Sequence, residues 1–162
     1  MNKLITAILL TLLLTSCGFQ PRGELPQLQA NLSPMQIRGL GISHQFRRIL
    51  EERLDVAGIT LGNKDNATTI LHIFRVKNHR QVLSLDERNK TVEYEITVKV
   101  DFKLLTATGE EMVTRQSVIT RHILFNPGDD LLGRTQEETL LRRDMYKTLS
   151  NQLIIRLQHQ AK

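Results

Sequence analysis

Cysteine and the large aromatic residues are nearly absent from this chain. Its 162 residues include one cysteine, no tryptophan, two tyrosines and five phenylalanines. One thiol cannot close an intramolecular disulfide, and one cysteine ligand does not make a zinc site. A disulfide-stapled domain and a cysteine-rich zinc domain are therefore excluded. With so few aromatic side chains, a buried core must be built mainly from leucine, isoleucine and valine.

Signatures of catalysis and of nucleic-acid binding are also missing. The histidines at 44, 72, 79, 122 and 159 show no metal-ligand spacing, and His72, which alternates with apolar residues, is expected in the core. No serine-nucleophile, phosphate-loop or dinucleotide glycine motif occurs. The chain has 22 Lys and Arg residues against 17 Asp and Glu residues, and the basic residues are dispersed. This modest positive charge gives nucleic-acid binding little support but favours anionic partners. Binding or assembly is favoured over catalysis.

The N-terminus has the form of a bacterial lipoprotein signal. Lys3 precedes an apolar run from Leu4 to Leu14, roughly half the ~20 residues that a membrane-spanning helix requires. The following Leu14-Thr15-Ser16-Cys17 resembles the lipobox of lipoprotein signal peptidase. We expect residues 1–16 to be a signal peptide and Cys17 to carry the lipid, with Gly18 in place of the aspartate that retains lipoproteins in the inner membrane. The alternatives are an ordinary cleaved signal and an anchor helix with an incidental cysteine.

After Cys17 the sequence predicts a short tether and then one domain. Residues 17–33 contain two prolines and no period, which indicates an acylated N-terminus with an extended tether. Residues 34–162 are expected to form a single domain that opens with a short strand at 34–40. A helix is predicted from Ser43, as N-cap, to Gly58, as left-handed stop, because its apolar residues form one stripe.

The second half of the chain predicts three strands and a long helix. Residues 70–76, continuing through 77–85, predict a strand with Ile70, His72, Phe74 and Val76 on its apolar face. Strict alternation over 91–106 predicts a strand with one buried and one wet face, and 112–125 returns as its hairpin partner. A capping box at Thr135 and Glu138 is expected to open the last helix. The order β-α-β-β-β-α predicts an α+β two-layer sandwich, with two helices on one face of a mostly antiparallel four-stranded sheet.

Several short motifs along the mature chain resemble the family of the lipopolysaccharide-assembly lipoprotein LptE, also called rare lipoprotein B. Cys17-Gly18-Phe19, followed by Arg22, resembles the mature N-terminus of the family. Glu93-Tyr94 resembles the pair that begins the family's third strand. The run before its last helix resembles Asn126-Pro127 and Leu131-Leu132-Gly133-Arg134, with Gly133 in place of the usual alanine. Met145-Tyr146 and Ile155-Arg156-Leu157 are similar to parts of that helix.

This resemblance implies a task, two partners and a place in the cell. A member of this family plugs the lumen of the outer-membrane β-barrel LptD in a one-to-one complex, helps to assemble that barrel and binds lipopolysaccharide. The resemblance implies an outer-membrane lipoprotein that faces the periplasm, is anchored by acyl chains on Cys17, and uses no cofactor. Candidate lipopolysaccharide-binding residues are Arg88, with Lys90 as its rival in the same loop, and Arg134 before the last helix.

Two other functions remain open at this point. A pilotin or another accessory lipoprotein for a different outer-membrane complex shares the anchor and the absence of chemistry, but predicts a different partner and no affinity for lipopolysaccharide. An anchored periplasmic hydrolase requires a cluster of polar groups around a perturbed carboxylate or histidine. No such cluster is visible in the linear sequence.

Overall fold

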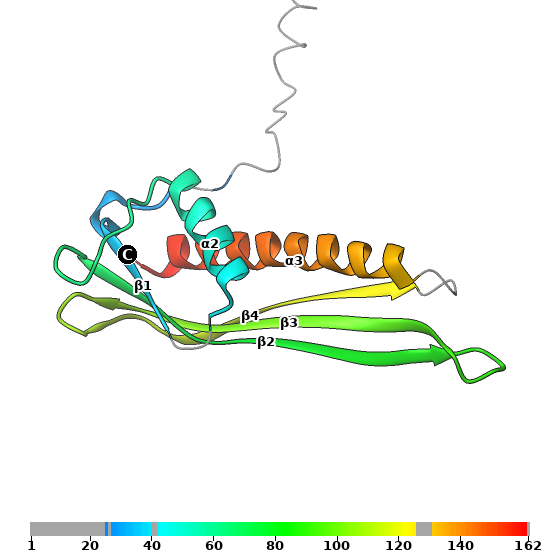
Figure 1. Ribbon diagram of the computed structural model, residues 1–162. Helices are drawn as coiled ribbons and strands as arrows, with labels where there is room; N and C mark the ends of the chain where they lie inside the picture. Colours follow the sequence, from blue (N-terminus) through cyan, green and yellow to red (C-terminus); the bar gives the residue numbers. More distant parts are fainter. Residues whose placement is uncertain (1–24, 26, 40–41, 126–130, 162) are drawn as a thin grey trace, which may run out of the picture.

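A computed structural model describes residues 25, 27–39, 42–125 and 131–161, with the backbone alone for 131–134. The elements follow the predicted order after a short 3₁₀ turn, as Figure 1 shows. They are η1 (Ala30–Leu32), β1 (Met35–Arg38), α2 (His44–Val56), β2 (Thr69–Leu85), β3 (Thr91–Thr106), β4 (Glu111–Phe125) and α3 (Leu131–Gln160).

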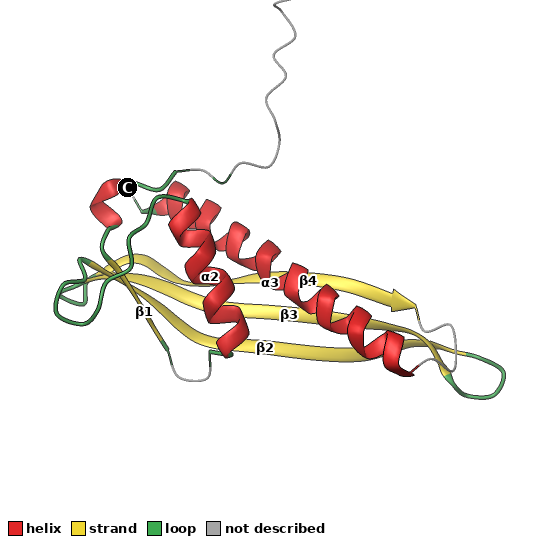
Figure 2. Cartoon of the chain, turned by 45° about the horizontal axis from the view of Figure 1, so that its top comes forward, coloured by secondary structure: helices red, strands yellow, loops and turns green. Residues whose placement is uncertain are grey.

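The four strands form one mixed sheet in the order β1-β2-β3-β4. β1 pairs with β2 in parallel, across the α2 connection, and the two hairpins β2–β3 and β3–β4 are antiparallel. Both helices lie on the same face of the sheet, and the other face, called the outer face here, is covered by no element of the described chain (Figure 2). The predicted α+β two-layer sandwich is thus confirmed, and the strand order is added by the structure.

The core lies between the sheet and the helices, and β3 contributes most to it. Six alternate residues of β3 are buried on the helix side: Tyr94, Ile96, Val98, Val100, Phe102 and Leu104. From α3, Leu149, Leu153 and Leu157 are fully buried against them. Burying side chains of this size stabilises a fold by about 1.5–3 kcal/mol each. The predicted faces of β3 and of the last helix are therefore confirmed.

The ends of α2 agree with the sequence prediction. The Ser43 hydroxyl accepts a hydrogen bond from the Phe46 amide at 3.2 Å, as an N-cap does. Gly58, with φ of +83°, follows the Ala57 C-cap. The predicted apolar stripe is buried, and its Phe46 ring meets the Tyr146 ring of α3 edge-on, with centroids 5.4 Å apart. This contact joins the two helices.

The predicted apolar face of β2 is wrong over its first half. Leu71 and Ile73 are buried in the core, whereas His72 and Phe74 lie on the outer face, their rings stacked with centroids 4.5 Å apart. The register shifts between Ile73 and Arg75, so Phe74 has no partner on β3. Such a bulge reverses the alternation, and Val76 accordingly packs against the core. His72 is therefore not the core histidine that the sequence predicted.

Two predicted boundaries also change. The last helix begins at Leu131, four residues before Thr135, so Thr135 and Glu138 lie within the helix and form no capping box.

Part of the expected tether, residues 27–33, packs on the domain. Leu28 and Leu32 are buried in the core, and the Leu28 amide donates to the Ala57 carbonyl at 2.9 Å. No periodic pattern marks this segment, because its two buried residues, Leu28 and Leu32, are connected by only one turn of 3₁₀ helix.

Candidate functional site

The loop that joins β2 to β3 carries two of the three predicted binding residues. Asp86 organises this loop, since its carboxylate accepts hydrogen bonds from the backbone amides of Arg88 at 2.9 Å and Lys90 at 2.8 Å. Asn89 has a left-handed backbone with φ of +58°, a conformation that asparagine tolerates. The Arg88 and Lys90 side chains are both exposed. A hydrogen-bonded turn therefore presents two exposed cations.

Arg134, the third predicted residue, does not lie in a loop. It belongs to the first turns of α3, and its side chain is outside the described part of the structure. The start of α3 lies at the same end of the molecule as the β2–β3 loop in both ribbon views (Figures 1 and 2). The structure thus places the backbone of Arg134 at the end that carries Arg88 and Lys90. We call this end the basic tip.

A polar network connects α3 to the strands behind the basic tip. The Glu138 carboxylate lies 3.7 Å from the Arg80 guanidinium of β2, and the Tyr94 hydroxyl of β3 donates to it at 3.4 Å. Arg142, one turn further along α3, pairs with the same carboxylate. The Arg80 guanidinium also covers the Tyr94 ring, 3.7 Å from its centroid. One carboxylate thus ties two strands to the first third of the helix.

Sequence reasoning missed this network because its members are distant in the chain. The sequence assigns Glu138 to a helix cap, and Arg80 lies in the predicted continuation of a strand, 58 residues earlier in the chain. One signal was available. Tyr94 stands among aliphatic residues on the buried face of β3, and a buried tyrosine hydroxyl requires a hydrogen-bond partner.

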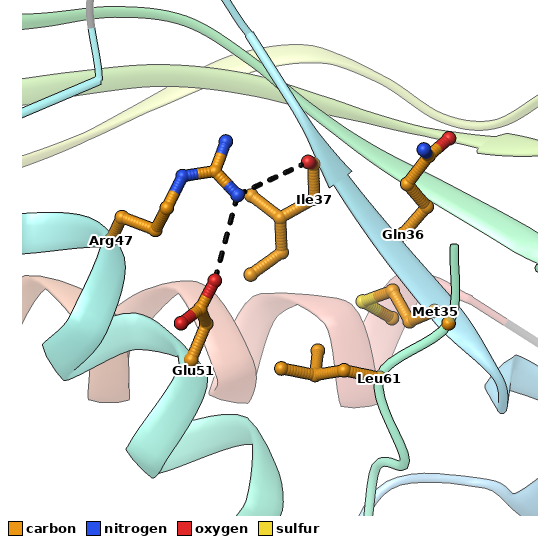
Figure 3. Close-up of a pocket in the computed structure, with 7 residues that line it drawn as sticks. Met35, Gln36, Ile37, Arg47, Glu51 and Leu61 are labelled. Atoms are coloured by element: carbon orange, nitrogen blue, oxygen red, sulfur yellow. Dashed lines mark hydrogen bonds and ion pairs between the residues drawn. The ribbon is translucent and has the colours of Figure 1, made fainter. Parts of the chain in front are cut away.

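A shallow pocket at the opposite end offers no chemistry of its own. About 230 Å³ in volume, it lies between β1 and α2, where it is lined by Met35, Ile37, Leu61 and the Arg47–Glu51 ion pair (Figure 3). The Arg47 guanidinium is 3.5 Å from Glu51 and also donates to the Ile37 carbonyl at 3.4 Å. Because both charges already have protein partners, this pocket is a packing irregularity beside the edge strand.

The described residues form neither a metal-ligand cluster nor a membrane-spanning helix. Within the described residues, no three His, Cys, Asp or Glu side chains gather as metal ligands do. No helix in that part of the chain is both long and apolar enough to cross a bilayer. Cys17, the predicted lipidation site, and the predicted signal peptide lie outside the described residues.

Taken together, the fold and the site define a class of protein. The described residues form a two-layer α+β domain that leaves one long sheet face uncovered and presents exposed cations at one end, features that suit a binding protein. Residues 29–157 match the family described as LptE, lipopolysaccharide-assembly. Since this match covers most of the chain, the protein belongs to the LptE family of lipopolysaccharide-assembly lipoproteins.

Solved structures of similar proteins support the fold. An uncharacterized lipoprotein B from Nitrosomonas europaea is 23% identical, with a TM-score of 0.68 over 87% of this chain and 90% of that one. A rare lipoprotein B from Shewanella oneidensis is 19% identical, with a TM-score of 0.63 over 75% and 90%. A minor lipoprotein from Acinetobacter baumannii is 19% identical, with a TM-score of 0.64 over 76% and 88%. At these identities the likeness concerns the fold alone.

Proposed function

We propose that this protein binds lipopolysaccharide through its basic tip while it plugs the lumen of an LptD-type outer-membrane barrel. The observation that carries the proposal is the tip itself, where Arg88 and Lys90 are exposed on a turn that Asp86 holds in shape. Lipopolysaccharide presents phosphates and carboxylates, which guanidinium groups bind bidentately. Membership of a lipopolysaccharide-assembly family makes this ligand the relevant anion.

The outer sheet face suits a barrel lumen. On β3 it presents Glu93, Glu95, Thr97 and Lys99 in alternation with the buried residues. The interiors of large membrane barrels are polar and water-filled, so a largely polar face suits that environment and need not contact the wall along its whole length. A lipid on Cys17 would hold the domain at the same membrane, since acyl chains contribute about 0.8 kcal/mol per buried methylene.

The ligand half of this proposal is tested by charge reversal at the tip. The triple variant Arg88→Glu, Lys90→Glu, Arg134→Glu should bind purified lipopolysaccharide at least about ten-fold more weakly at low ionic strength, because three attractive charges become repulsive. The matched control is Arg48→Glu, Lys64→Glu, Arg143→Glu, three exposed residues away from the tip. Circular dichroism establishes that both variants are folded. Equal binding by the two triple variants would refute the assignment of the tip.

The partner half is tested separately. The acylated protein is extracted from its own outer membrane in mild detergent, and the proteins that accompany it are identified by mass spectrometry. A stoichiometric large β-barrel of the LptD type is expected. Recovery of a secretin or another assembly complex in its place would favour the pilotin class and contradict the plug.

A further inference from the structure

The outer face of the sheet carries a second group of cations, at the other end from the basic tip. Six basic residues from all four strands share this region with two acidic ones, Asp101 and Glu111. The basic residues, which we call the basic patch, are Arg38, Arg75, Lys77, Lys99, Lys103 and Arg115. Arg75 and Leu85 are ten residues apart on β2, so the patch lies roughly 30 Å from the tip loop.

The register places like charges beside one another in this patch. Lys77 pairs directly with Lys99 across β2 and β3, and Arg38, His72 and Lys103 form one cross-strand row. Like charges that face each other on a sheet destabilise it. The register also sets Arg75 directly across from Asp101, so one contact in the patch is favourable within the fold. An anion that bridges the two like-charged rows would remove the repulsion that remains.

The two acidic residues neutralise only part of the charge. Asp101 is held by the Ser117 hydroxyl at 2.6 Å, and its carboxylate lies 3.5 Å from Lys99 and 3.7 Å from Arg115. Glu111 accepts a hydrogen bond from Lys103 at 2.7 Å. Arg38, Arg75 and Lys77 are exposed and form no ion pair with a described acidic residue. The patch therefore keeps a net positive charge on an open surface.

The β2 bulge places one aromatic ring beside two of these cations. Phe74, turned outward by the bulge, has the Arg115 guanidinium 4.2 Å and the Lys103 ammonium 5.9 Å from its ring centroid. Cation–π contacts of this kind restrict long side chains while leaving their N–H groups available. Burial and the charges of Lys103 and Arg38 lower the pKa of the neighbouring His72, as expected where positive charge exceeds negative.

From this geometry we infer that the basic patch is a second anion-binding surface, which takes the phosphate groups of a phosphorylated saccharide. The inference rests on the proposed function for the identity of that saccharide, the hydrophilic part of lipopolysaccharide. Residues from four strands can contact several phosphates at once, since neighbouring strands are about 4.8 Å apart. The protein would then hold its ligand at two places along one face.

An anionic membrane surface is the less suitable occupant. The segment before β1 packs beside α2, on the helix side of the sheet (Figure 1). The eight residue-to-residue steps from Cys17 to Leu25 extend at most about 29 Å. An anchor at Cys17 would thus approach the domain from the helix side, whereas the basic patch faces the opposite way.

The test uses the full-length acylated protein in a non-ionic detergent and a defined probe, the deacylated phosphorylated oligosaccharide of lipopolysaccharide. The variant Arg75→Gln, Lys77→Gln removes two exposed charges without breaking a described ion pair. Isothermal titration calorimetry at low salt should show affinity reduced about five-fold or more. The matched control Arg48→Gln, Arg143→Gln, two exposed helix residues, should bind within about two-fold of the native protein.

Four outcomes would overturn the inference. They are native affinity in the Arg75→Gln, Lys77→Gln variant, an equal loss in the control, unchanged binding after phosphatase treatment of the probe, and patch-dependent binding only to phosphatidylglycerol vesicles. The proposed function is judged apart from this. If reversal of the tip charges abolishes lipopolysaccharide binding while the patch variant binds normally, the tip assignment stands and the basic patch falls.

Discussion

At the scale of single residues, Asp101 shows how a carboxylate is kept ionised in a nearly covered position. Its side chain is 11% exposed. Burial alone raises the pKa of this carboxyl, but the Ser117 hydrogen bond and the Lys99 and Arg115 charges outweigh burial and hold the pKa below its ordinary value. Asp101 therefore stabilises the folded state wherever it is charged.

Replacing Asp101 with asparagine should lower the free energy of unfolding by roughly 1–3 kcal/mol at pH 7. Since the folded-state pKa is depressed, this stabilisation is complete above the unfolded value of 3.8 and is lost as the pH falls through the folded value. Urea unfolding at pH 7, and at a series of pH values that falls progressively below 3.8, should show the difference between the variant and the native protein shrink as Asp101 is protonated. The control Glu111→Gln breaks a more exposed ion pair and should cost about 0.5 kcal/mol or less. A gap between Asp101→Asn and native protein that is unchanged in acid would contradict the assigned role.

At the scale of elements, α3 is held by two different kinds of contact along its length. Its later turns are fixed by fully buried leucines, among them Leu149, Leu153 and Leu157. In its first half, residues Thr135–Asp144 have mostly exposed side chains and are tied to the sheet by Glu138. Few buried apolar contacts mean low local stability, so the basic tip depends on a polar attachment.

We therefore expect Glu138→Gln to loosen the start of α3 more than it lowers global stability. Loss of the charge weakens the contacts to Arg80, Arg142 and the Tyr94 hydroxyl, at a cost of about 1–2 kcal/mol. Hydrogen exchange should accelerate at the amides of residues 136–142 and stay unchanged near Leu153. The adjacent Glu137→Gln, at an exposed position, is the control and should change neither. Equal protection in the two variants would mean that the network does not hold the helix.

At the scale of the whole molecule, the helices cover one face of the sheet and no described element covers the other. Along one edge of the sheet, β4 pairs with no further described strand. β4 is the last strand of the order, and three of its large apolar side chains, Ile119, Ile123 and Phe125, are 41%, 56% and 57% exposed. Long apolar edge strands favour pairing with another chain. The protein should thus tend to self-associate when it is isolated without a partner.

Substituting Ile123 with lysine should reduce that self-association, because a charge on an edge strand opposes pairing. Analytical ultracentrifugation of the purified protein should show a larger monomer fraction, with the free energy of unfolding changed by about 0.5 kcal/mol or less. Ile155→Lys, at a site 42% exposed on α3, is the control and should leave association unchanged. An identical association constant for native protein and Ile123→Lys would exclude the β4 edge as the contact.

The sequence by itself determined the element order, the buried face of β3 and both ends of α2. These features depend on local periodicity and on caps within a few residues, so they can be read along the chain. Only the tertiary structure decided the strand order, the outward position of His72 and Phe74, and the pairing of Glu138 with Arg80. Each of these depends on register against a neighbouring strand or helix. A one-residue bulge reverses which side chains face the core up to the next irregularity, and the bulge at Phe74 is visible only once β2 is aligned with β3.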